Sequence, residues 1–306
     1  MNKILIETSM DGISMDRIIR NTEFTMATGH FHDEYEIYYL MEGERYYFIE
    51  NKTYHIHKGS LVLINRRSIH KTANVGSSSY HDRYLIELKK EPLSSFMDIY
   101  GEIPLEKFFK EHNGVLRIDK NDQPYIEQLL YGISDEIRSE KPGYRTLAML
   151  KLCELLVFVQ RTKTNKQTTQ DNMINTHSSA YNQINEIAMY ISEHYTDNIS
   201  LDNIAKHFFI SKSYLSRRFK EVTGFAVNEY INLKRIKYSQ ELLADKTLNI
   251  TAVSEKTGYN SITYFEKTFK RCTGFTPRQY RNNLQSFLRP VRLDTSQHLT
   301  GSDYSI

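Results

Sequence analysis

Three imidazoles and one carboxylate in the N-terminal part of the chain are residue types that bind metals and polar ligands. His30, His32 and Glu36 occupy alternate positions, so on one β-strand their side chains share a face. His70 follows a later strand-like run that can close the same sheet. Imidazole and carboxylate ligands suit a divalent transition metal. Burying these groups unpaired costs roughly a few kcal/mol each, so we expect them to meet a ligand, a metal, water or one another.

A second candidate site lies in a stretch that occurs twice. Residues 214–225 recur as residues 264–275 with Tyr, Phe, Lys, Thr, Gly and Phe in register. Such a period is typical of one supersecondary unit used twice. In each copy the apolar residues form one helical stripe, which Thr-Gly closes as a C-cap. The stripes are Leu215, Phe219 and Val222 in the first copy, and Phe265, Phe269 and Cys272 in the second.

The opposite face of each predicted helix carries groups that can reach phosphates and base edges. Arginine can bridge O6 and N7 of guanine, so Arg217 is our strongest candidate for reading a base, and Arg218 is the alternative phosphate-binding neighbour. The remaining residues on these faces are Lys212, Ser213, Ser216 and Lys220 in the first copy, and Ser261, Ile262, Glu266, Lys267, Lys270 and Arg271 in the second.

Each of these helices follows a short amphipathic one, over residues 201–208 and 250–257, so the pattern predicts two helix-turn-helix units. The second turn contains Gly258, as such turns often do. The first has Phe209 instead, which would be strained by roughly 1 kcal/mol relative to glycine in a left-handed conformation. Between the units, residues 227–243 predict a helix of about 25 Å, with Lys234, Arg235 and Lys237 exposed.

A Pro-x-x-Tyr element, Pro277 to Tyr280, follows the second copy of the repeat. Together with the repeated elements, it makes residues 183–285 resemble the paired helix-turn-helix module of the AraC/XylS family of transcription regulators. One departure is Ala226-Val227, where the second copy has the helix-starting Thr276-Pro277. The resemblance implies that double-stranded DNA is the partner. It also implies that the bases are faced by Ser213, Ser216, Arg217, Ile262, Thr263, Glu266 and Lys267.

The N-terminal part predicts short strands over residues 24–88, which suit a sandwich or small barrel. The pattern His30-Phe31-His32, Glu36, Gly43, Gly59 and His70 resembles the cupin signature, although Ser60 and residues 65–67 depart from it. Such a domain commonly precedes the DNA-binding half in AraC-like proteins. The resemblance implies an effector, a sugar or a related metabolite, and no metal or other cofactor. The predicted effector-binding residues are His30, His32, Glu36 and His70 of this pattern, and Tyr38, whose ring and hydroxyl suit a polar ligand.

Residues 94–112 predict short helices, and residues 123–140 and 144–160 predict an antiparallel helical pair with wide apolar stripes. One side must cover the barrel. The remaining apolar surface of the pair either completes an intramolecular core or pairs with a second subunit, as the family resemblance implies. A homodimer is therefore one of two open alternatives.

Composition and charge divide the chain further. Residues 181–292 carry 17 Lys and Arg against 10 Asp and Glu, a net charge of +7, whereas the whole chain has only +3. A basic module attached to a slightly acidic remainder is typical of a nucleic-acid-binding protein with a separate sensor domain. Residues 162–180 are polar and aperiodic, as in a flexible linker.

Cys153 and Cys272 are far apart and lie in apolar helical phases, so they form neither a disulfide framework nor a metal motif. A reducing cytosol is the simplest compartment. The first ten residues lack an apolar run, and no run of 18 apolar residues occurs, so we expect no signal peptide and no membrane span.

The sequence therefore predicts a multidomain fold: an N-terminal cupin-like β-barrel with a helical pair, and a C-terminal all-α double helix-turn-helix. The predicted boundaries are residues 1–161 for the sensor, 162–180 for the linker, 181–288 for the DNA-binding domain and 289–306 for the tail. The two units are residues 201–223 and 250–273.

We predict a cytoplasmic, sequence-specific regulator that responds to an effector and is not an enzyme, so no residue is assigned as catalytic. RNA polymerase is a further candidate partner, and activation or repression stays open. The alternative is a metal-dependent cupin enzyme tethered to a DNA-binding module. A third possibility, that the duplicated helices bind protein, is disfavoured by their Arg and Lys residues.

Overall fold

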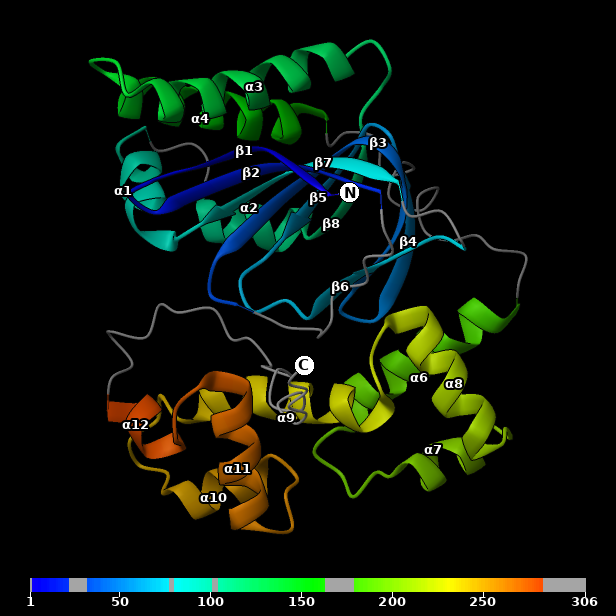
Figure 1. Ribbon diagram of the computed structural model, residues 1–306. Coiled ribbons are helices and arrows are strands. Elements are labelled where there is room, and N and C mark those ends of the chain that lie inside the picture. The colour runs from blue at the N-terminus through cyan, green and yellow to red at the C-terminus, as the bar shows by residue number, and fades with distance from the viewer. Residues whose placement is uncertain (1, 22–31, 77–79, 101–103, 163–178, 283–306) are drawn as a thin grey trace, which may run out of the picture.

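The computed structural model describes residues 2–21, 32–76, 80–100, 104–162 and 179–282. In these residues a β-sheet domain with two long helices on one side lies against an all-helical domain (Figure 1). The predicted strand residues 24–31, nearly all of the predicted linker and the predicted tail fall outside the described ranges. Among the described helices, none has the length and apolar content needed to cross a membrane.

The sheet is built around one long strand, β3 (Tyr35–Ile49), which pairs antiparallel with four others. Its first half pairs with β5 and β7, and its second half with β4 and β6. Two further strands extend the β7 edge, and β8 pairs with β5. The bounds are β1 (Lys3–Met10), β2 (Ile13–Arg20), β4 (Lys52–His57), β5 (Ser60–Ile64), β6 (His70–Ala73), β7 (His81–Leu88) and β8 (Gly114–Arg117).

A bulge in β3 decides which side chains point into the barrel. The register against β7 shifts between Leu40 and Glu42, and such a shift changes which residues face each side. Gly43 follows with φ of 91°, and a Cβ atom there would lie 2.4 Å from the Tyr80 carbonyl oxygen. Interior residues are therefore even-numbered before the bulge and odd-numbered after it, as Leu40 and Tyr47 show.

The outer side of the sheet packs against helices. Tyr35, Ile37 and Tyr39 belong to the same apolar core as the buried stripes of α3 (Gln123–Ser139) and α4 (Tyr144–Thr162). Two shorter helices, α1 (Lys90–Tyr100) and α2 (Leu105–His112), join this core. The predicted helical pair and short helices are confirmed, with α4 extending to Thr162.

The strand predictions were correct within the middle of the domain and incomplete at its edges. Residues 35–41 and 45–50 were predicted as two strands, but they form the single strand β3, which continues through Gly43. Strands β1, β2, β6 and β8 were missed. β1 and β2 mix polar and apolar residues because they are largely half-exposed, and β6 and β8 have only four residues each.

The C-terminal domain is described as seven helices between residues 179 and 282. Serine side chains accept hydrogen bonds at the starts of three of them, through Ser200, Ser211 and Ser261. Gly224 and Gly274 end the two duplicated helices in the left-handed conformation, as predicted. The helices are α6 (Ser179–His194), α7 (Leu201–His207), α8 (Lys212–Thr223), α9 (Val227–Leu242), α10 (Ile250–Lys256), α11 (Ile262–Thr273) and α12 (Pro277–Asn282).

The two turns differ as the sequence predicts. Gly258 has φ of 84°, and Phe209 has φ of 55°, which is uncommon for a residue with a large side chain. The Phe209 side chain is 95% exposed and gains little from packing. The departure at Ala226 also affects a helix start: Ala226 offers no side-chain cap, although Glu229 accepts from its backbone N–H at 3.2 Å.

We expect Phe209→Gly to raise the free energy of unfolding by about 1 kcal/mol, because glycine removes the left-handed strain and no packing is lost. The measurement is urea unfolding followed by circular dichroism. Phe209→Ala is the control, since it shortens the side chain but keeps the strain. A gain of the same size in both variants would contradict the explanation.

Candidate DNA interface and effector site

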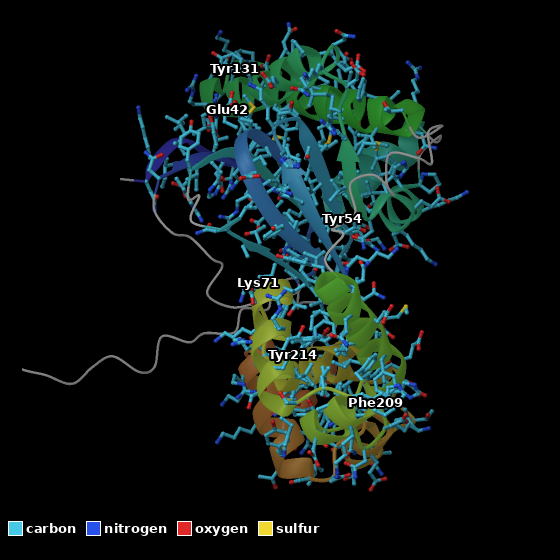
Figure 2. The ribbon with its side chains drawn as sticks, turned by 90° about the vertical axis from the view of Figure 1, so that its right-hand side faces the viewer. Glu42, Tyr54, Lys71, Tyr131, Phe209 and Tyr214 are labelled. Carbon is cyan, nitrogen blue, oxygen red and sulfur yellow. The ribbon has the colours of Figure 1, made fainter. Side chains whose placement is uncertain are left out.

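The duplicated helices present their polar faces to solvent. All ten predicted DNA-binding side chains are exposed: Lys212, Ser213, Ser216, Arg217 and Lys220 on α8, and Ile262, Thr263, Glu266, Lys267 and Lys270 on α11. The predicted apolar stripes are buried on the other side, with Phe219 and Phe269 both fully covered. Figure 2 shows Tyr214 and Phe209 in this helical domain, at a distance from the sheet.

The neighbouring arginines of α8 differ in their surroundings. Arg218 forms an ion pair with Glu221 at 2.7 Å and lies over the ring of Tyr181 at 5.9 Å. Arg217 is exposed and makes no ion pair with another described residue. An arginine held in this way positions a helix, whereas one extending into solvent can enter a groove. The contrast favours Arg217 over Arg218 as the base-reading side chain.

A carboxylate, Glu36, gathers the polar residues inside the barrel. His32 and His70 each place Nε2 3.3 Å from the Glu36 carboxylate. The hydroxyl of Tyr47 donates to Glu36 Oε1 at 2.6 Å. Burial opposes ionisation of Glu36, yet His70 and His32 outweigh it and hold the pKa of Glu36 well below its ordinary value. Burial likewise disfavours a charged His32, but the hydrogen bond to Glu36 raises the pKa of His32.

The structure thus brings His32, Glu36, Tyr38 and His70 into one interior, while His30 lies outside the described residues. His32 precedes β3 instead of lying on it, so the expected strand alternation is wrong for this residue. The Tyr38 ring packs edge-on against Tyr47, with centroids 5.4 Å apart. Among the described residues, no hydrogen-bond partner faces the buried Tyr38 hydroxyl.

Two groups of described residues have donor atoms close enough to hold a metal ion. His32, Glu36 and His70 form the buried group, and Glu44, His55 and His57 form a more exposed one on β3 and β4. In each group the three ligand atoms lie within 4.8 Å of one another. Two imidazoles and a carboxylate suit a divalent transition metal. In the buried group, Glu36 also has polar partners without a metal, since it binds His32 and the hydroxyl of Tyr47.

A contact between the two domains had no signal in the sequence. Glu50, which follows β3, accepts from Lys234 at 2.5 Å and from Lys237 at 2.8 Å, both on α9. Its backbone carbonyl accepts from the hydroxyl of Tyr230. Lys234 and Lys237 were predicted as exposed, and this prediction is wrong, because only 11% and 25% of their side-chain surfaces remain exposed. Arg235, predicted likewise, donates to the Tyr195 carbonyl at 2.6 Å.

Apolar packing surrounds this ionic contact. Phe48 points out of the barrel into the core of the helical domain, with its ring centroid 5.8 Å from Phe225 and 5.7 Å from Tyr230. Lys71 of β6, which Figure 2 places where the domains meet, donates to the Gly224 carbonyl at 2.6 Å. A Cβ atom on Gly224 would lie 2.5 Å from the Lys71 side chain, so this glycine serves both the C-cap and the contact.

We expect Glu50→Gln to lower the free energy of unfolding by about 2 kcal/mol at pH 7, because two partly buried ammonium groups lose their counter-charge. Thermal unfolding of the full chain measures this loss, and small-angle scattering shows whether the domains separate. Glu42→Gln, a change on β3 itself, is the control, since Glu42 is half-exposed and pairs with the half-exposed Lys58. Equal losses in the two variants would contradict a special role for Glu50.

The same contact predicts a pH dependence. Burial opposes ionisation of Glu50, but Lys234 and Lys237 outweigh it and lower its pKa from 4.5 to about 2. A depressed carboxyl pKa contributes stability that is complete above the ordinary value and is lost as the pH falls toward the folded-state value. The stability difference between the parent chain and Glu50→Gln should therefore shrink between about pH 4.5 and pH 2. A constant difference across this window would argue against the ion pairs.

Comparison with known proteins follows the same division. Residues 14–156 match the family model of the AraC-like ligand binding domain, and residues 204–283 match that of a helix-turn-helix domain. The chain is 27% identical to the arabinose operon regulatory protein of Escherichia coli strain K12 over 186 residues, which are 60% of this chain and 61% of that protein. It is 22% identical to the HTH-type transcriptional activator RhaS of Escherichia coli O6:H1 over 85% of this chain and 89% of that protein.

A shorter match, 30% identical, covers 34% of this chain and 34% of the regulatory protein PocR of Salmonella typhimurium. The chain thus spans less than two thirds of the length of the arabinose operon and PocR proteins. The ligand-binding and helix-turn-helix matches occur in the order, and over the residues, that the fold gives to the barrel and the helical domain. The chain belongs to the AraC/XylS family of transcription regulators.

Proposed function

We propose that this protein is a sequence-specific DNA-binding regulator whose DNA binding responds to a small molecule held by the barrel domain. The observation that carries the proposal is the pair of serine-capped helices, α8 and α11, whose ten predicted DNA-binding residues are all exposed, while a single helix, α9, joins the two units. Lysine contacts to phosphates supply affinity, and Arg217 with its neighbours supplies base preference.

The effector is proposed to bind in the barrel interior beside Tyr38 and the Glu36 cluster. An arabinose operon regulator among the relatives supports a sugar or a related metabolite as one class of effector. His30 remains part of this proposed site on the sequence pattern alone. The proposal includes no metal and no catalysis, because the relatives are named as regulators. A cupin enzyme is the alternative, and turnover of a small substrate would establish it.

A homodimer is proposed through the outer side of α3 and α4. Tyr131 on α3 is 53% exposed, and Leu147 and Leu150 on α4 are 45% and 48% exposed; Tyr131 is visible at the far end of the sheet domain from the helical domain in Figure 2. Apolar side chains clustered at a surface favour association.

Cytoplasmic localisation and contact with RNA polymerase also belong to the proposed function. The domain boundaries at residues 161, 180 and 288 stay proposals.

Arg217→Ala and Lys220→Ala should weaken DNA binding in different ways. We expect Arg217→Ala to cost about 1–3 kcal/mol and to relax the preference at one base pair, since a bidentate contact to a base is lost. Lys220→Ala should weaken all sequences alike and lower the salt dependence by about one ion. Selection from random duplexes, followed by titrations at several salt concentrations, distinguishes them. An unchanged base preference in Arg217→Ala would reject its assigned role.

Tyr38→Phe should separate effector binding from folding. Removing a buried hydroxyl that has no partner among the described residues should leave stability unchanged or raise it by about 1 kcal/mol. The same change should abolish the response of a reporter gene to its inducer, because the hydroxyl serves the effector. Tyr39→Phe, on the helix-facing side of the strand, is the control and should respond normally. A full response in Tyr38→Phe would remove this residue from the site.

A further inference from the structure

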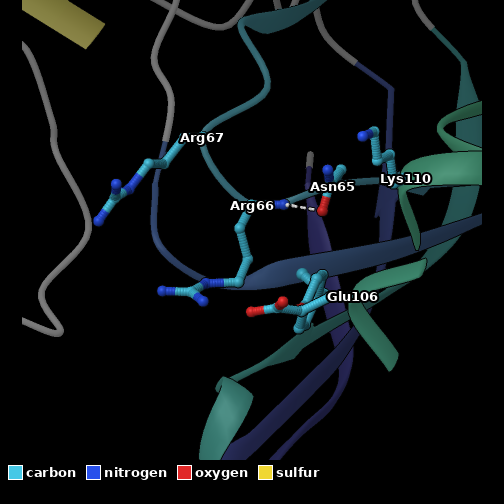
Figure 3. A pocket seen from close by; sticks show the side chains of 6 residues that line it. Asn65, Arg66, Arg67, Glu106 and Lys110 are labelled. Atoms are coloured by element: carbon cyan, nitrogen blue, oxygen red, sulfur yellow. Dashed lines mark hydrogen bonds between the residues drawn. The ribbon is translucent and has the colours of Figure 1, made fainter. Parts of the chain in front are cut away.

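An open cavity lies at one end of the barrel, next to the loop that follows β5. It has a volume of about 340 Å³ and is lined by Tyr35, Asn65, Arg66, Arg67, Glu106 and Lys110. Figure 3 shows that Asn65, Arg66 and Arg67 come from the loop after β5 and that Glu106 and Lys110 come from α2. Its size suits a small metabolite, and three of its six lining residues are cationic.

The cations of this cavity are not all neutralised. Asp33 accepts from Arg67 at 2.6 Å and from Arg66 at 3.3 Å, so one carboxylate serves two guanidinium groups. Glu106 is paired with Lys90 at 2.6 Å. Lys110 is exposed and forms no ion pair with any residue in the described ranges. The cavity therefore keeps an excess of positive charge on the guanidinium groups of Arg66 and Arg67 and on the Lys110 ammonium group. Planar guanidinium groups and an ammonium group suit a carboxylate or a phosphate.

The loop beside the cavity is tightly fixed. Arg67 has φ of 59°, a left-handed conformation that is unfavourable for a residue with a side chain. Its backbone N–H donates to the His32 carbonyl at 2.6 Å. Asn113 binds the loop from outside, accepting from the Asn65 backbone at 2.8 Å and donating to Ser68 Oγ at 3.0 Å. Strain that the surroundings hold in place is often found at ligand sites.

The same loop ends on the carboxylate that holds the two domains together. Ser68 Oγ donates to Glu50 Oε1 at 3.0 Å, and the Ile69 backbone N–H donates to it at 3.2 Å. The Glu50 backbone N–H donates to the Ile69 carbonyl at 2.7 Å. Glu50 is also left-handed, with φ of 55°. A run of four residues thus joins the side chains that line the cavity to the acceptor of Lys234 and Lys237.

We propose that this cavity binds a small anionic ligand, through a carboxylate or phosphate group held by Arg66 and Lys110, and that occupancy alters DNA binding through Ser68, Ile69 and Glu50. The proposal rests on the proposed regulatory function and adds to it the chemical class of a ligand and a place for it outside the barrel interior. A ligand that competes with Asp33 for the arginines shifts the loop, and the loop carries two of the hydrogen bonds that fix Glu50.

A second cavity provides the comparison. It has a volume of about 500 Å³ near the start of α3 and is also basic, with Lys58, Arg117 and Lys120 among its lining residues. Lys58 is already paired with Glu42 at 2.5 Å. Among the described residues, the polar partners of the Glu50 carboxylate are Ser68, Ile69, Lys234 and Lys237, none of which lines this cavity. Lys120 is exposed like Lys110, so Lys120→Gln is a matched control for an effect of charge alone.

The test uses the full chain with sodium phosphate and sodium citrate as probes, and sodium chloride at equal ionic strength as the reference. Isothermal titration should give a saturable site for at least one probe, and Lys110→Gln should weaken it about tenfold or more. Lys120→Gln and Lys107→Gln, the latter on α2 with Lys107 paired to Glu111, should bind as the parent chain does. Lys110→Glu, a charge reversal at the same exposed position, should abolish binding.

The second measurement is the dissociation constant for a selected DNA duplex with and without saturating probe. We expect a change of at least about threefold in the parent chain and in Lys120→Gln, and none in Lys110→Gln. Saturable binding that leaves the affinity for DNA unchanged would overturn the regulatory link, and equal probe binding in Lys110→Gln and the parent chain would overturn the site. If the parent chain bound no DNA duplex in the absence of probe, the result would instead count against the proposed function itself.

Discussion

The Glu50 carboxylate is the point at which the two halves of the chain meet. A partly buried carboxylate is costly unless it is paired, and here the pairing comes from Lys234 and Lys237, which belong to the other domain. The backbone at Glu50 is itself left-handed. The fold therefore accepts both desolvation and backbone strain at one residue, where α9 supplies the counter-charge and Ser68 and Ile69 supply further hydrogen bonds.

The position of Glu50 follows from the course of β3. The bulge after Leu40 turns Tyr47 inward to Glu36 and Phe48 outward to Phe225. Adjacent residues of one strand thus contact the interior cluster and the core of the DNA-binding domain. Tyr47 and Phe48 therefore lie on opposite faces of β3, three and two residues before Glu50. Without the bulge, the strand would present Phe48 to the barrel interior and Tyr47 to the helices.

The helical domain was predictable in detail, and the contact between the domains was not. Two copies of one pattern fixed the helices, their glycine C-caps and even the left-handed Phe209, because all these features depend on local sequence. Lys234 and Lys237 were predicted as exposed because an amphipathic pattern shows that a face is polar but not what covers it. Glu36 was placed on the interior face correctly by alternation, whereas Tyr47 contacts Glu36 only because of the bulge, which no spacing in the sequence indicates.

The arrangement of contacts indicates how the barrel can act on DNA binding. Contacts of the barrel with the helical domain involve α9, the turn after α8 and the first half of α6, through Glu50, Lys71 and Thr53. The side chains proposed to face DNA remain exposed on both α8 and α11, so the barrel does not cover them. Lys234 and Lys237 lie one turn apart on the helix that sets the separation of the two units. Glu50 therefore contacts the helix that joins the two units. For the proposed DNA binding this position matters, because two helices that enter successive grooves together need a defined separation.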